Sequence, residues 1–216
     1  AGNAFPETGA RLQQSALIPN GTRTFNIIDV ADHILDNTLD PPVKALFIYN
    51  HNPVAVHPNQ NHMKKALLRD DLFIVGCDIE MTDSMAYADI ILPASSHFEF
   101  ADIYGSYGHH YLQRAEPVIP RVGESLPNTD IFRLLAARFG FDEPIFQETD
   151  AELMDAAFAD NDPRLGGTKP SDLPLDLALA MTTKDGEELI LCKTVLPSTD
   201  SGKIELFSQD LEARFG

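Results

Sequence analysis

Cysteine is scarce in this sequence: Cys77 and Cys192 are its only two among 216 residues. Two thiolates are too few to ligate an iron–sulfur cluster or to build a structural zinc site by themselves. We expect both cysteines to be reduced thiols of an intracellular, cytoplasmic protein, and a disulfide between them stays open as an alternative.

Long apolar runs are absent as well. No stretch approaches the ~20 apolar residues that a membrane-spanning helix needs, so we expect no membrane span. The first residues, AGNAFPETGARLQQ, lack a basic segment followed by an apolar one, which argues against a signal peptide. The sequence also begins without methionine, and we therefore expect a processed chain or a piece of a longer one.

Positive charge is in short supply. The chain has 16 Lys and Arg residues against 33 Asp and Glu, which gives a formal net charge of −17. Because no basic stripe offsets this field, we exclude nucleic acid and anionic membranes as partners. The ordinary use of such acidity is solubility, and an acidic scaffold or interaction domain is an alternative function.

Glycine-rich nucleotide motifs are missing too, since neither G-x-G-x-x-G nor G-x-x-x-x-G-K-[ST] occurs. What the sequence does contain is an alternation of short apolar runs and amphipathic segments. Helical spacing is predicted over 25–37, 59–70 and 82–88, and strands over 44–49, 72–78 and 89–93. This order predicts an α/β fold with an open, mainly parallel, doubly wound (Rossmann-like) sheet and flanking helices. After Lys44, the strand at 44–49 is apolar, which is typical of burial on both faces.

The second half of the chain has a weaker pattern. We expect an irregular loop over 95–123, a helix over 128–140 capped by Asn128 or Thr129, and a helix over 150–159. Apolar runs at 188–196 and 202–208 predict a small C-terminal β extension. The expected organisation is an N-terminal extension (1–22), an α/β dinucleotide-cofactor-binding domain (23–160), and an irregular segment with the β extension (161–216) that leads to a further C-terminal domain.

Polar residues follow two of the predicted strands directly. The first strand is followed by Asn50, His51, Asn52 and Pro53, and the second ends on Asp78. In open parallel sheets, ligands bind outside the carboxyl ends of the strands, so we predict a ligand site at these positions. Proline fixes the backbone there, and a carboxylate can accept two parallel N–H bonds from a guanine edge or two O–H bonds from a ribose diol.

Thr82 extends this predicted site, because a helix beginning there would present backbone N–H groups to a phosphate. The competing interpretation is that Asn50, Asn52 and Asp78 only satisfy turns and that Thr82 only caps a helix. The residues alone leave both interpretations open.

Other kinds of site fit the sequence less well. His51, His57 and His62 lie within twelve residues, and His109 and His110 are adjacent, but their spacings match no standard metal signature. We interpret them as surface or loop-packing histidines and predict no metal ligand. The run ADNDPRLGG lacks the oxygen register of a calcium loop, and ASSH lacks the glycines of a nucleophile elbow, so we predict no catalytic residue either.

Taken in order, these pieces resemble the molybdopterin oxidoreductase family, which includes dimethyl sulfoxide reductase, formate dehydrogenases and nitrate reductases. The resemblance covers roughly residues 23 to 212. Its most specific parts are Asn52-Pro53, the run TDSMAYADIILP from Thr82 to Pro93, and Glu99. NTDIFRLLAARFG and SGKIELFS, further along the chain, also match the family's order.

The resemblance implies a parent enzyme with a bis(molybdopterin guanine dinucleotide) cofactor that carries molybdenum or tungsten. This chain resembles the third domain, an α/β domain that binds one guanine dinucleotide arm. By analogy, Asn50 and Asn52 would lie by the phosphate or pterin side, and we count His51 and Pro53 of the same loop among the cofactor-binding residues. Asp78 would lie by the guanosine and Thr82 near the dinucleotide.

The chain also departs from the family pattern. It lacks the Cys-rich cluster motif, the segment with the protein ligand to the metal, and the C-terminal β-barrel domain. The run EFADIYGSYGHHYLQR replaces the E-x-x-G-T and N-x-E-G-R pattern that many members have after the glutamate. We therefore expect an inactive piece of an oxidoreductase that contains no bound cofactor as purified. Its partners would be the remaining domains of the parent chain and an electron-transfer subunit. A free-standing, non-catalytic nucleotide-binding module is the alternative.

Overall fold

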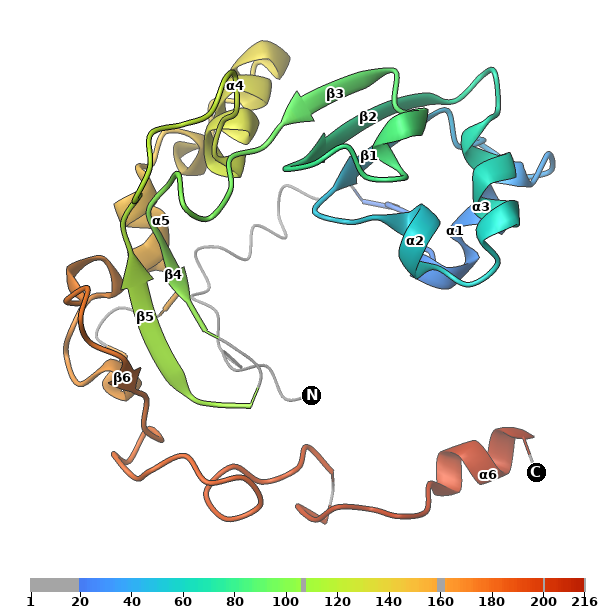
Figure 1. The fold of residues 1–216 in the computed structure, drawn as a ribbon. Coiled ribbons are helices and arrows are strands. Elements are labelled where there is room, and N and C mark those ends of the chain that lie inside the picture. Colours follow the sequence, from blue (N-terminus) through green and yellow to red (C-terminus); the bar gives the residue numbers. More distant parts are fainter. Residues whose placement is uncertain (1–19, 106–107, 159–161, 200, 216) are drawn as a thin grey trace. The chain divides into compact units, whose positions relative to one another are not determined.

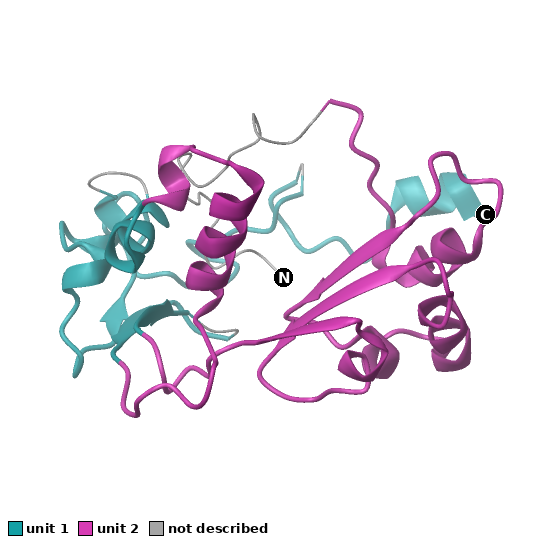
Figure 2. Ribbon diagram, turned by 90° about the horizontal axis from the view of Figure 1, so that it is seen from above, with its two compact units in different colours: residues 1–14, 101–116, 148–216 teal, residues 15–100, 117–147 magenta. Residues whose placement is uncertain are grey.

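The computed structural model describes residues 20–105, 108–158, 162–199 and 201–215. They form two compact units (Figure 2). Among the described residues, unit 2 consists of 20–100 and 117–147, and unit 1 of 101–105, 108–116, 148–158, 162–199 and 201–215. This division cuts across the predicted domain of residues 23–160, because the chain leaves unit 2 twice within it. The predicted N-terminal extension lies almost wholly outside the described residues.

Unit 2 is built on a parallel three-stranded sheet in the order β1-β2-β3, with helices alongside it (Figure 1). This confirms the predicted α/β fold class. Its first elements are, in chain order, η3 (Ile27–Asp29), α1 (Val30–Leu35), β1 (Ala45–Tyr49), α2 (Pro53–Val56), α3 (Gln60–Leu67), β2 (Phe73–Asp78), η4 (Met85–Tyr87) and β3 (Ile90–Pro93).

The main core of unit 2 lies between one face of this sheet and α1, α2 and α3. Ile48 of β1 and Ile74 of β2 point into it together with Met85 of η4. Gly76 lets η4 pack directly on β2, since a Cβ atom at this position would clash with the Sδ atom of Met85. Burial of these side chains supplies the main stabilisation of the unit.

The opposite face of the sheet is only partly covered, so the prediction that β1 is buried on both faces was wrong. Phe47 and Tyr49 of β1 are each 40% exposed, and Phe73 of β2 is 48% exposed. The helix α4 (Asn128–Phe139) covers the rest, with the Phe132 ring centroid 5.9 Å from that of Phe47 and 5.1 Å from that of Tyr49.

The limits of α4 differ slightly from those predicted. Pro127 occupies the N-cap position and makes no side-chain cap bond, so neither Asn128 nor Thr129 is the cap. The helix ends as expected at Gly140, whose φ of 77° is in the left-handed region that glycine adopts readily. Leu134, which helical spacing places on the same apolar face of α4 as the buried Ile131, is 58% exposed. A short turn, η5 (Pro144–Phe146), follows.

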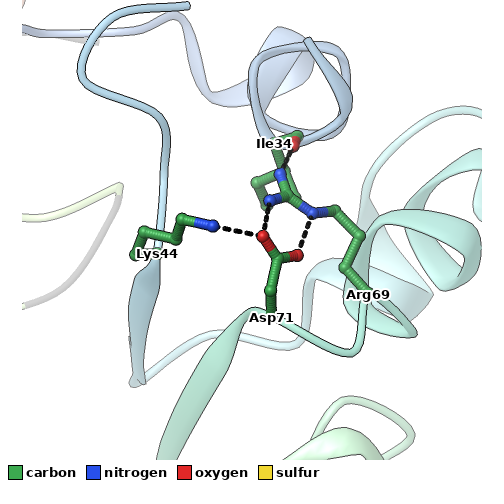
Figure 3. Close-up of polar contacts among 4 residues, drawn as sticks. All are labelled: Ile34, Lys44, Arg69 and Asp71. Carbon is green, nitrogen blue, oxygen red and sulfur yellow. Dashed lines mark hydrogen bonds and ion pairs between the residues drawn. The ribbon is translucent and has the colours of Figure 1, made fainter. Parts of the chain in front are cut away.

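A polar cluster fastens the amino end of the sheet (Figure 3). The carboxylate of Asp71, just before β2, accepts hydrogen bonds from Lys44, just before β1, and from Arg69 at 2.8 and 2.7 Å. Arg69 also donates to the backbone oxygen of Ile34 in α1. These bonds, with Arg69 contributing most, hold the pKa of Asp71 far below its usual value.

Glu99 fastens the chain where it leaves unit 2 and returns to it. Its side chain is 8% exposed and accepts hydrogen bonds from the backbone N–H of Ser96 at 2.5 Å and of Val122 at 2.7 Å, with the Ser125 hydroxyl at 3.4 Å. The two backbone bonds lower the pKa of Glu99. Residues 95–123 are therefore tethered at their base, although the sequence predicts an irregular loop.

Unit 1 contains a second sheet, which is antiparallel and has the order β4-β5-β6. Part of the predicted loop thus forms strands. The apolar runs at 188–196 and 202–208 form no strand, and β6 lies earlier in the chain. The elements of unit 1 are β4 (Asp102–Tyr104), β5 (Tyr111–Ala115), α5 (Asp150–Ala156), η6 (Pro163–Leu165), η7 (Pro170–Asp172), β6 (Leu179–Ala180) and α6 (Gln209–Phe215).

The core of unit 1 is smaller than that of unit 2. Leu112 of β5 packs with four other buried side chains: Phe158, Leu165, Leu173 and Met181. The helix α5 begins at a capping box, in which Thr149 and Glu152 each satisfy the other's backbone N–H.

Candidate functional site

The predicted ligand residues lie at the carboxyl edge of the parallel sheet in unit 2. The parallel register pairs Tyr49 with Cys77, and the backbone N–H of Asn50 then donates to the oxygen of Cys77 at 3.4 Å. Asp78, the next residue of β2, pairs with Pro93 of β3. The ends of β1 and β2 are therefore adjacent, as the sequence pattern predicts.

Asn50 turns the chain out of β1. Its φ is 55°, in the left-handed region that asparagine tolerates better than most residues, and it is exposed. The side-chain amide has no hydrogen-bond partner within the part of the chain that the structure describes. Asn50 is therefore placed to offer both an amide donor and a carbonyl acceptor to a ligand at this edge.

A buried serine ties the two strand ends together. The hydroxyl of Ser84, which is 0% exposed, donates to Oδ1 of Asn52 at 2.7 Å and accepts from the N–H of Val54 at 3.0 Å. The N–H of Ser84 also donates to Oδ1 of Asn52 at 3.3 Å. Because the oxygen of Asn52 is occupied, its NH₂ group is the part left for a ligand, and that group only donates.

Pro53 gives this loop its fixed shape. It is buried at the first position of α2, where its missing N–H leaves no unsatisfied donor. Its backbone oxygen accepts from the N–H of His57 at 3.1 Å. The short helix α2 therefore brings His57 back toward the residues that follow β1.

Asp78 keeps most of its hydrogen-bonding capacity. One oxygen accepts from the N–H of Ile79 at 2.8 Å, and no basic side chain of the described residues pairs with it. Burial and, secondly, the Asp78 carboxylate raise the pKa of the neighbouring Cys77 thiol. That buried thiol donates to Oδ1 of Asn128 at 3.7 Å, while the side chain of Asp78 is half-buried.

Thr82 lies beside these residues but does not begin a helix of useful length. The predicted helix at 82–88 is the three-residue turn η4, with Ser84 at its N-cap position. The Thr82 hydroxyl accepts from the N–H of Met85 at 3.4 Å. The prediction of a helix over 82–88 was therefore wrong, and the side-chain hydroxyl is the group that Thr82 can offer to a ligand.

His51 pairs with His57, a residue that the sequence pattern assigned only to loop packing. Their Nε2 atoms lie 2.7 Å apart and their ring centroids 4.8 Å apart. His57 is 9% exposed, and its Nδ1 atom is buried without a hydrogen-bond partner. The six-residue spacing of these histidines was visible in the sequence, but the contact depends on α2 and carries no local signal.

Metal ligands do not gather at this edge or elsewhere in the described residues, where no group of three or more His, Cys, Asp or Glu side chains could hold a metal ion. Cys77 and Cys192 are both free thiols. Among the same residues, no helix combines the length and the apolar character needed to cross a membrane.

The fold is an α/β unit, and the candidate site lies at the carboxyl edge of its parallel sheet. The model of the molybdopterin oxidoreductase family matches residues 24–138, which include this whole edge and α4 nearly to its end. The chain belongs to the molybdopterin oxidoreductase family.

Curated relatives agree with this assignment. The chain is 42% identical over 204 residues to a protein of Bacillus subtilis (strain 168) called "Probable oxidoreductase YoaE", covering 93% of this chain and 29% of that protein. It is 35% identical over 102 residues to a dimethyl sulfoxide/trimethylamine N-oxide reductase of Cereibacter sphaeroides, covering 46% of this chain and 12% of that protein. The chain thus spans less than a third of the length of these relatives.

A solved structure shows the same fold. Acetylene hydratase from Pelobacter acetylenicus superimposes with a TM-score of 0.63 at 24% sequence identity, covering 90% of this chain and 26% of that chain. At this identity the likeness concerns the fold alone.

Proposed function

We propose that this chain is part of a molybdopterin-guanine-dinucleotide-dependent oxidoreductase and that unit 2 binds one guanine dinucleotide arm of the cofactor. The observation that carries the proposal is the meeting of Asn50, Asn52 and Asp78 at adjacent ends of parallel strands. Open parallel sheets bind ligands at this edge, and the family's cofactor contains a ligand of the matching chemistry.

The donors and acceptors at the edge fit the two ends of such an arm. Asp78 uses one oxygen for the N–H of Ile79, but a carboxylate has about four lone-pair sites and can still accept two N–H bonds from guanine. The NH₂ group of Asn52 and the free amide of Asn50 are suited to phosphate oxygens. The hydroxyl of Thr82 adds a further polar contact for the dinucleotide.

In this proposal the protein holds and orients the cofactor, and the molybdenum or tungsten pterin, when bound, supplies the transfer of an oxygen atom or of electrons. We assign no catalytic role to the described residues, and the isolated chain is expected to be inactive. The remaining domains would come from the rest of a longer polypeptide, and an electron-transfer subunit would accept or deliver the electrons. We place the protein in the cytoplasm, which agrees with its two free thiols.

Replacing Asp78 in the full-length polypeptide tests the proposal. Each charged hydrogen bond lost costs about 1.5–3 kcal/mol, or roughly tenfold or more in affinity. Asp78→Ala should therefore lower the guanine nucleotide content per polypeptide, measured after acid release, while the melting temperature stays close to that of the wild type. The guanine nucleotide content of Asp78→Asn should be as low as that of Asp78→Ala or lie between that value and the wild-type value, because its NH₂ group would face guanine donors.

Asp70→Ala is the matched control, because it removes an exposed carboxylate from the loop that precedes β2 rather than from the ligand edge. It should keep full cofactor loading. Full loading of Asp78→Ala would show that Asp78 only closes a turn, and the guanosine assignment would then be wrong.

A further inference from the structure

The residues around the ligand edge contain no lysine or arginine. None occurs between Lys44 and Lys64 or between Arg69 and Arg114, and these two segments include all the residues that follow β1 and β2 at this edge. A diphosphate bound here would carry negative charge into a chain whose net charge is already −17. A histidine is therefore the side chain that can supply positive charge from these segments.

The His51–His57 pair can hold one added proton but not two. A distance of 2.7 Å between the Nε2 atoms is that of a hydrogen bond, so one nitrogen donates and the other accepts. If both rings were fully protonated, both Nε2 atoms would carry hydrogen and the bond would be lost. The pair is thus either neutral or singly charged.

His57 is the member that stays neutral. Burial lowers its pKa first, and the neighbouring His51 lowers it further. Its Nδ1 atom is buried without a partner, so no acceptor there would offset the buried charge of a protonated His57. His51 is less buried, and it is the pair's member within the loop that follows β1.

The Asp, Glu and His side chains that directly follow β2, or that come next to the pair along the chain, are three carboxylates and one histidine. Asp78, Glu80 and Asp83 follow β2, and His62 of α3 is paired with Asp32 of α1 at 2.7 Å. His62 is therefore engaged elsewhere, and the carboxylates cannot serve an anion.

We propose that His57 is a positioning residue, which holds His51 through the Nε2–Nε2 hydrogen bond so that its Nδ1–H can bind the diphosphate of the dinucleotide arm. Binding then brings one proton onto the pair, and it resides on His51. This inference rests on the proposed function, because it presumes that the arm lies at this edge. The affinity for the diphosphate should fall as pH rises, because binding takes up a proton and the concentration of free protons is lower at higher pH.

The 216-residue chain and two probes test the inference. GDP carries the guanine and the diphosphate, and guanosine carries the guanine without it, so the ratio of their affinities reports the diphosphate contact. Isothermal titration calorimetry in buffers of different ionisation enthalpy gives the number of protons taken up. The wild type should prefer GDP, take up close to one proton with it at mildly alkaline pH, and take up none with guanosine.

The variants separate contact from positioning. His51→Ala should lower the preference for GDP about tenfold and abolish proton uptake, because a charge-assisted hydrogen bond is lost. His57→Phe should do the same while keeping an apolar ring in place, and His57→Gln, whose amide can still hydrogen-bond His51, should restore much of the preference. His62→Ala, a histidine outside the pair, should behave as the wild type.

The inference would be overturned if His51→Ala kept the wild-type preference for GDP, or if the wild type took up no proton with GDP. Guanosine binding would in either case still support the proposed function. Loss of both probes in the wild type would instead contradict the proposed function. If His57→Phe does not fold, His57→Gln decides the positioning role, since retained uptake supports it and complete loss overturns it.

Discussion

At the scale of the residue, the site depends on contacts that the sequence shows only in part. Asn52 is marked as a site residue by its place after an apolar strand and before a proline. Ser84, which fixes the side chain of Asn52, lies 32 positions away and has no local pattern of its own. Polar residues that follow strands can therefore be predicted, whereas the buried groups that orient them emerge only from the tertiary structure.

Glu99 provides a test at this scale. Its pKa is lowered by the backbone N–H groups of Ser96 and Val122, so its ionised form stabilises the folded state. This contribution is present above the unfolded pKa of about 4.3 and is lost as pH falls through the lower, folded value. Glu99→Gln should lower the melting temperature at neutral pH, and the difference from the wild type should shrink in acid.

The matched control is Glu80→Gln, which neutralises an exposed glutamate of the same unit. Thermal unfolding followed by circular dichroism across the acid range gives both differences. A pH-independent difference for Glu99→Gln, or an equal one for Glu80→Gln, would show that the ionised Glu99 does not fasten residues 96–125.

At the scale of the element, the apolar runs predict β1, β2 and β3 well because each is bounded by polar or proline residues. The runs at 188–196 and 202–208 have the same composition but form no strand, since a run of this kind needs a neighbouring strand to pair with. Leu134 shows a similar limit, because helical spacing marks a face of α4 but not how much of that face is covered.

A substitution at Gly76 tests how closely η4 must pack on β2. Thr82 and Ser84 lie directly before η4 in the chain. Gly76→Ala should push η4 outward, because the new methyl group meets the buried side chain of Met85. Overpacking destabilises the folded state by about 1–3 kcal/mol, and the lower entropy of the unfolded chain offsets about 0.4–1 kcal/mol of this. The free energy of unfolding, measured with urea, should therefore fall by roughly 1–2 kcal/mol.

A double-mutant cycle checks the stated cause. Met85→Ala alone should cost about 2–5 kcal/mol through the cavity it leaves. In the Gly76→Ala, Met85→Ala variant the added methyl group no longer clashes, so the combined loss should be smaller than the sum of the two. Strict additivity would mean that Gly76 is not required for the packing of η4.

At the scale of the whole molecule, several apolar surfaces have no cover within the described chain. Phe73 of β2 and Leu206 near the C-terminal helix are 48% and 98% exposed. The chain corresponds to 29% of the length of its relative from Bacillus subtilis. We propose that the rest of a longer polypeptide covers these surfaces, an interaction that the sequence of this piece cannot reveal because the covering residues are not in it.

The most direct test of the central claim, that unit 2 holds a guanine dinucleotide arm, is to map guanine nucleotide binding on the isotope-labelled 216-residue chain by nuclear magnetic resonance. Titration with GDP should shift the amide signals of residues 50–52 and 78–82, while ADP, which offers Asp78 a poorer match, should shift them less. Shifts confined to other residues, or equal effects of GDP and ADP at this edge, would contradict the account.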